Sequence, residues 1–129
     1  METNVSKISL LWVVVMVGFA MHMLADLLPL CWGANVAMPD ATGEAPMGML
    51  VFMISIAFAV PMCGLLCQHY RSSRSMRVAN MVLASIMLLF CVLHMAELLE
   101  EFSPVQAIIL VLMVIASLFL FILSRRALK

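Results

Sequence analysis

The sequence predicts an all-α protein, a bundle of four helices that each cross a membrane. Of its 129 residues, 66% are hydrophobic and 11% are charged, and the mean hydropathy of +1.18 lies far above that of a soluble domain. The apolar residues fall into four long stretches, each close to the roughly 20 residues that a helix needs to span a bilayer. These stretches cover residues 8–30, 47–67, 78–95 and 105–123.

The four stretches use most of the chain, so residues 1–129 are predicted to form a single integral membrane domain. No room is left for a separate soluble domain. Backbone polar groups find no water in hydrocarbon, so each spanning segment must pair them within a helix. The partner that composition predicts is therefore the lipid bilayer.

Proline residues mark where these helices end, bend or begin. Pro29 is expected to end or bend the first span. Pro61, followed by Gly64, is expected to kink the second, because proline removes a helical hydrogen bond and clashes with the preceding turn. Ser103 and Pro104 are typical of an N-cap and a first helical residue, so the fourth span is predicted to begin there.

Aromatic and small residues make two further predictions about packing. Trp12 and Trp32 are interpreted as interfacial anchors, as tryptophan often is at the membrane–water boundary, although Trp12 lies a few residues deeper than usual. Small residues such as Gly18 and Gly64 allow helices to approach closely. They favour a compact bundle over an open pore.

The basic residues all lie on one side of the predicted bundle. They are Lys7 before the first span, Arg71, Arg74 and Arg77 between the second and third, and Arg125, Arg126 and Lys129 after the fourth. The other two connections carry acidic residues and no lysine or arginine. The positive-inside bias therefore predicts a bacterial inner-membrane protein with both termini and the middle connection in the cytoplasm.

Two similar phrases stand near the predicted outer ends of the first and third spans, HMLADLL at 22–28 and HMAELL at 94–99. Both spans run from inside to outside. The match suggests two helix hairpins that are parallel repeats, related by an axis along the membrane normal. It is short and needs a one-residue gap, so chance similarity stays open as an alternative.

Each phrase places an imidazole and a carboxylate within reach of each other. His22 and Asp26 are four residues apart and His94 and Glu97 are three apart, so each pair lies on one helical face. An ionisable side chain in a membrane helix costs roughly 2.5 to 3.5 kcal/mol on insertion scales, so these groups need partners, water or an ion. The four residues are the predicted functional site, with a divalent metal ion as the predicted ligand.

Other interpretations of the same four residues remain open. Methionines of the outer half add Cu(I) as an alternative metal. The groups could instead form a proton relay or the outer end of a transport path, or His22 and His94 could be axial ligands of a haem. In the simplest alternative the pairs only lock helix to helix. The inner halves of the spans offer few polar groups, which disfavours a transporter built from one chain.

No motif indicates an enzyme or a nucleic-acid surface. The prediction is a small non-enzymatic inner-membrane protein whose outer cluster binds a metal ion or protons. The alternative class is an accessory subunit or immunity-type protein whose polar pairs specify packing. Either class is compatible with a homo-oligomer or with another membrane protein as partner.

Several short segments resemble a known group of proteins. They are Leu10-Leu11-Trp12, Ala25-Asp26-Leu27, Tyr70-Arg71 and Arg77-Val78-Ala79-Asn80. With these segments, the chain resembles small uncharacterised bacterial four-helix membrane proteins of the DoxX-like kind. The resemblance touches three of the four spans and implies an inner-membrane bundle with no established activity. It gives weight to Asp26 and Asn80 as shared polar positions.

The orientation is tested with topology reporters. Reporters fused after Lys129 or placed at 72–75 are expected to be cytoplasmic, and one placed at 35–44 is expected to be exported. The reason is the confinement of all basic residues to one side. A cytoplasmic 35–44 segment would overturn both the orientation and the outer location of the cluster.

Overall fold

A computed structural model describes residues 2–37, 43–44, 46–100 and 102–128. In these ranges the chain is helical and contains no strand, which confirms the predicted all-α class. The elements are α1 (Glu2–Leu27), the 3₁₀-helix η1 (Leu28–Trp32), α2 (Met47–Ile54), the π-helix η2 (Ser55–Ala59), α3 (Val60–His69), α4 (Arg74–His94), α5 (Glu97–Glu100) and α6 (Pro104–Arg126).

Four helical stretches of the described chain are long and apolar enough to cross a membrane. They are Lys7–Trp32, Met47–His69, Arg74–Leu99 and Pro104–Arg126. Each contains the corresponding predicted span, and the third begins one turn earlier than expected. The protein is therefore a multi-pass membrane protein built as a four-helix bundle.

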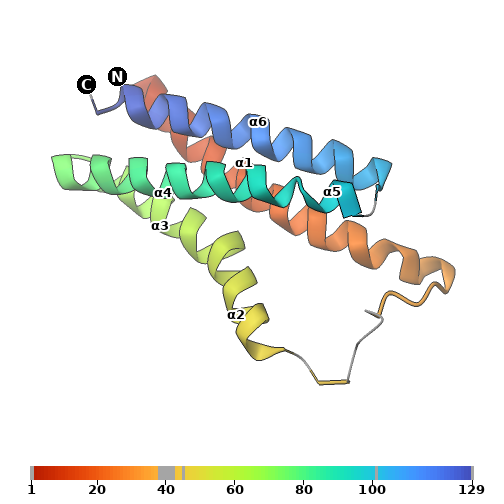
Figure 1. Cartoon of the computed structure of the whole chain (residues 1–129). Coiled ribbons are helices and arrows are strands. Elements are labelled where there is room, and N and C mark those ends of the chain that lie inside the picture. The colour runs from red at the N-terminus through yellow and green to blue at the C-terminus, as the bar shows by residue number, and fades with distance from the viewer. Residues whose placement is uncertain (1, 38–42, 45, 101, 129) are drawn as a thin grey trace.

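The helices form a ring in which α1 and α4 are diagonal to each other. Helix α1 packs against α3 and α6, and α4 packs against the same two helices. Both chain ends and the turn between α3 and α4 lie at one end of the bundle (Figure 1). The hairpin pairing fits the predicted parallel repeat, but the two hairpins differ in detail because only the first has a broken second helix.

The centre of the bundle is an apolar layer contributed mainly by α1, α4 and α6. Its buried side chains include Val15, Phe19, Ala84, Met87, Leu110 and Met113. Lipid tails are as apolar as these residues, so close packing rather than the hydrophobic effect holds this layer together. The layer separates two polar zones, one at each end of the bundle.

The second span is interrupted immediately before Pro61. Residues Ser55–Ala59 form a π-helix, because the proline ring displaces the carbonyl four residues earlier and leaves it without its helical donor. The Ser55 hydroxyl also donates to the Val51 carbonyl at 2.7 Å, a contact that bends helices. The predicted disruption is confirmed. On the N-terminal side of this π-helix, α2 turns away from the other helices and buries no residue (Figure 1).

Trp12 does not anchor the protein at the membrane surface, so that prediction is wrong. Its side chain is fully buried, and its indole N–H donates to Asn80 Oδ1 at 2.9 Å. Gly64 makes room for the ring: a Cβ at this position would lie 2.2 Å from Trp12 Cε2. The hydrogen bond to Asn80 and the space left by the absent side chain of Gly64 therefore place the Trp12 ring inside the bundle. Trp32 is exposed at the end of η1, where the anchor interpretation still applies.

Substituting Gly64 tests this packing. We expect Gly64→Ala to lower the free energy of unfolding in detergent by about 1–3 kcal/mol, the usual cost of overpacking a core. Gly48→Ala is the matched control, since nothing lies within 4 Å of the added Cβ. Equal stabilities of the two variants would show that the Trp12 ring does not rest on Gly64.

Candidate functional site

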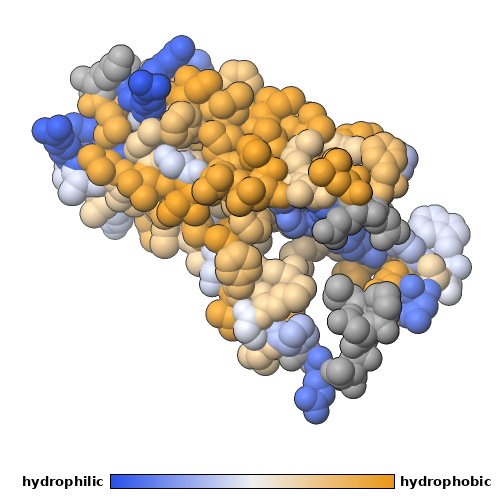
Figure 2. All heavy atoms as spheres, in the orientation of Figure 1, coloured by the Kyte–Doolittle hydropathy of each residue, from blue (hydrophilic) through white to orange (hydrophobic). Residues whose placement is uncertain are grey.

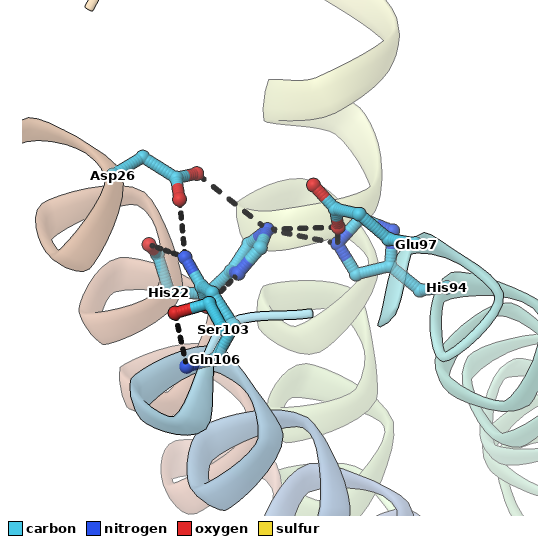
Figure 3. A network of polar contacts seen from close by, with 6 residues as sticks. All are labelled: His22, Asp26, His94, Glu97, Ser103 and Gln106. Carbon is cyan, nitrogen blue, oxygen red and sulfur yellow. Dashed lines mark hydrogen bonds and ion pairs between the residues drawn. The ribbon is translucent and has the colours of Figure 1, made fainter. Parts of the chain in front are cut away.

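The polar cluster at the other end of the bundle is assembled by α1, α4, α5 and α6 (Figure 3). His22 lies in the last turns of α1, and His94 is the last residue of α4. After His94 the backbone continues with three-residue hydrogen bonds, Ala96 N to the Leu93 carbonyl and Leu98 N to the Met95 carbonyl. Residues three apart eclipse each other in such a turn, so Glu97 stays on the same side as His94.

Three of the four predicted site residues converge on one point. His94 Nε2 lies 2.9 Å from His22 Nε2 and 3.4 Å from Glu97 Oε2. Glu97 Oε2 lies 3.7 Å from His22 Nε2. The three atoms all fall within 4.8 Å of one another, so two imidazoles and one carboxylate from three elements share one small volume.

The fourth predicted residue, Asp26, lies beside this group rather than in it. Its Oδ2 is 4.0 Å from His22 Nε2, and its Oδ1 accepts a hydrogen bond from Gln106 Nε2. The two carboxylate side chains of Asp26 and Glu97 are about half exposed, whereas the His22 ring is buried. The site therefore has a buried imidazole at its base and carboxylates at its mouth. A role for Asp26 as a direct ligand stays a prediction.

Gln106 fixes the protonation pattern of His22. Its amide nitrogen donates to the His22 carbonyl at 3.3 Å and to Asp26, so its amide oxygen must face His22 Nδ1, at 2.6 Å. An amide oxygen only accepts, so this network assigns the proton to Nδ1. The Nε2 lone pair of neutral His22 then points toward His94 and Glu97.

Aromatic rings hold the second imidazole in place. The His94 ring stacks on Phe90 with centroids 5.4 Å apart and an interplanar angle of 21°. Phe19 approaches both rings, at 6.5 Å from His94 and 5.8 Å from Phe90. These contacts form the apolar wall between the site and the centre of the bundle, and they restrict the orientation of His94.

Atoms that can accept a proton or bind a cation face one another in this cluster. The lone pair of His22 Nε2, the second imidazole nitrogen and the Glu97 carboxylate face one another, so a proton or a metal cation must lie among them. In a tetrahedral zinc site with bonds of about 2.0–2.1 Å, ligand atoms are roughly 3.3–3.4 Å apart. The distances of 2.9, 3.4 and 3.7 Å scatter around that value.

A haem does not fit this arrangement. Axial ligands approach the iron from opposite faces of the porphyrin. His22 Nε2 and His94 Nε2 are only 2.9 Å apart, which leaves no space for an iron and a porphyrin plane between them. The haem alternative is therefore wrong for this pair of histidines.

Gln106 was not among the predicted site residues, although the sequence carried a signal. It is a strongly polar residue in the first turn of an otherwise apolar helix, where it needs a partner as much as a histidine does. The predicted cap of this helix is confirmed: the Ser103 hydroxyl accepts from the Gln106 backbone N–H at 3.4 Å. The cap fixes the first turn of α6, and this places the Gln106 side chain beside His22.

Comparisons with known protein families, with curated proteins and with solved structures give no match for this chain. The resemblance to DoxX-like proteins therefore stays a prediction.

A double-mutant cycle tests the contact between His22 and Gln106. The free energy of unfolding is measured for the wild type, His22→Ala, Gln106→Ala and the double variant. We expect a coupling energy of about 0.6 kcal/mol, and at most about 1.7 kcal/mol, the range measured for hydrogen bonds between membrane helices. The control cycle pairs Gln106 with His69, which lies at the opposite end of the bundle, and should show no coupling. If the cycle of His22 and Gln106 also showed no coupling, the assigned hydrogen-bond network would be refuted.

Proposed function

We propose that this protein is a non-enzymatic membrane protein that binds one divalent transition-metal ion at the outer end of its bundle. The ligands are His22 Nε2, His94 Nε2 and Glu97 Oε2. The observation that carries this proposal is the Gln106 amide oxygen at 2.6 Å from His22 Nδ1. It directs the other ring nitrogen, with its lone pair, toward the remaining two ligands.

The donor set favours zinc or a similar ion. Two imidazoles and one carboxylate suit borderline metals and provide three protein ligands, with a fourth position left for water or for Asp26. Metal-binding histidines almost always donate their second ring N–H to an acceptor that orients them. Gln106 has this role for His22, and Phe90 restricts the orientation of His94 by stacking.

Binding is better supported than conduction through one chain. The outer cluster is closed off from the opposite end by the apolar layer that contains Phe19, Met87 and Met113. On the other side of this layer, the Asn80 amide donates to the Ser124 hydroxyl at 2.8 Å. In the bacterial inner-membrane orientation proposed from the basic residues, the metal site faces the outside of the cell.

The second candidate function is a structural membrane protein in which the same cluster locks the helices. The 2.9 Å separation of the two Nε2 atoms is a normal hydrogen-bond length. One proton on His94 Nε2, donated to His22, satisfies both rings without any ion. This candidate covers an accessory subunit, an immunity-type protein or a homo-oligomer.

Metal analysis of the purified protein separates the two functions. We expect one equivalent of metal in the wild type, a higher melting temperature on adding zinc, and loss of both in His22→Ala, His94→Ala and Glu97→Gln. Binding to the folded state stabilises it by linkage. Protonated imidazole has no free lone pair, so occupancy should fall as the pH drops through the histidine range. His69→Ala is the control, because this exposed histidine lies at the opposite end.

The structural alternative makes a different prediction for the same samples. The wild type would carry no stoichiometric metal, and zinc, copper, iron and manganese would leave its melting temperature unchanged. Each substitution would then cost about 0.6 kcal/mol, the average for a hydrogen bond between membrane helices. That result would refute the metal proposal and support the structural function, in which the cluster only holds the helices together.

A further inference from the structure

A second polar site lies at the end of the bundle opposite the metal ligands. A cavity of about 630 Å³ opens between the end of α3, the start of α4 and the end of α6, and Arg71, Arg77 and Arg126 are among its lining residues. Hydrophilic side chains gather at this end of the molecule, next to a broad apolar surface (Figure 2). The proposed metal site has no part in this cavity.

The described residues that line the cavity include positive charge and no acidic side chain. No acidic residue is among the described residues that line it, and the carboxylates of Asp26 and Glu97 lie in the histidine cluster at the other end. Arg77 donates to the Arg71 carbonyl at 3.5 Å. Three cations around one cavity repel one another and attract an anion from solution or from the membrane surface.

Neutral hydrogen-bond donors lie at the floor of the cavity. Asn80 uses both ends of its amide, accepting from Trp12 and donating to Ser124. Ser124 therefore accepts one bond, while its own proton finds no acceptor among the described residues. Gln68 is only 4% exposed, lines the cavity and makes no hydrogen bond within the described chain. No fully buried side-chain nitrogen or oxygen of the described residues is left without a partner, so the Gln68 amide must reach the open volume of the cavity, where a polar occupant can bind it.

We propose that this cavity binds the phosphate group of an anionic ligand. Arginine guanidinium groups match phosphate oxygens through paired, charge-assisted hydrogen bonds, and the Gln68 amide and the Ser124 hydroxyl supply neutral donors beneath them. The cavity is far larger than one water molecule, which takes about 30 Å³ of liquid volume. It lies at the ends of the spans, where lipid head groups are found. The phosphate comes from an anionic phospholipid or from a soluble phosphate compound.

The test uses the full chain in nanodiscs and measures bound phosphate and melting temperature. One sample contains phosphatidylcholine only, a second contains added phosphatidylglycerol, and a third is the first with inorganic phosphate. Lipid retention is read by native mass spectrometry, and phosphate by ³¹P line broadening. Binding in the second sample alone identifies a lipid, and binding in the third identifies a soluble ligand. Either supports the proposal, and binding in neither overturns it.

Matched variants distinguish a built site from general attraction to a basic surface. Arg77→Gln and Arg126→Gln should each weaken binding at least about tenfold, because each removes charge-assisted bonds. Arg74→Gln and Arg125→Gln remove the same charge from exposed arginines that do not line the cavity, and they should change binding less than about twofold if attraction over a Debye length is all that is lost. Equal effects of the two pairs would overturn the proposal.

Two further variants keep the test decisive if Arg77→Gln does not fold. Arg126 is exposed, so Arg126→Lys keeps both the fold and the charge and removes only the planar fork, and binding should weaken. Gln68→Leu keeps the volume and the net charge and removes the floor donor, so it should weaken binding without changing its salt dependence. Wild-type binding by both variants would show that charge alone attracts the anion, against the proposal.

Discussion

Polar side chains that meet across the centre of an apolar bundle are the constraint on which the rest of this structure depends. Helices α1 and α4 are diagonal rather than adjacent, so only long side chains can join them. Trp12 reaches Asn80 near one end, and His22 reaches His94 near the other. Each group would be left unsatisfied in hydrocarbon if the helices slid or rotated. Two contacts at different depths therefore fix the relative height and rotation of α1 and α4.

Helix α6 contributes one hydrogen-bond partner to each of the two contacts between α1 and α4. Ser124 accepts from Asn80, and Gln106 binds His22. The two α6 residues are separated by almost the whole helix, so its register is set at both ends. The layer between them, including Leu110 and Met113, can then pack closely. Met113 lies so close to Gly18 that a Cβ there would be 2.6 Å from Met113 Cγ.

The sequence was sufficient to predict the spans, the disrupted second helix and the two His–carboxylate pairs. These features follow from local rules: hydrocarbon forces backbone pairing within helices, Pro61 cannot continue a regular helix, and a charged group in a span needs a partner. Gln106 and the burial of Trp12 could not be derived in this way. They depend on which helices are neighbours, and Gln106 is 84 residues from His22. The ring order of the helices is information that hydropathy does not contain.

The departure of α2 from the bundle explains why the outer cluster is open. Helix α2 buries no residue. Its Phe52 ring contacts Phe90 of α4, with ring centroids 6.0 Å apart, and so reaches the apolar wall beside His94 rather than the carboxylates. Asp26 and Glu97 are about half exposed there, while His22 behind them is buried. A carboxylate facing hydrocarbon would be costly, so this opening must face water or the head-group region. The π-helix before Pro61 thus affects more than the second span, because by diverting α2 it leaves the two carboxylates accessible to ions from outside the bundle.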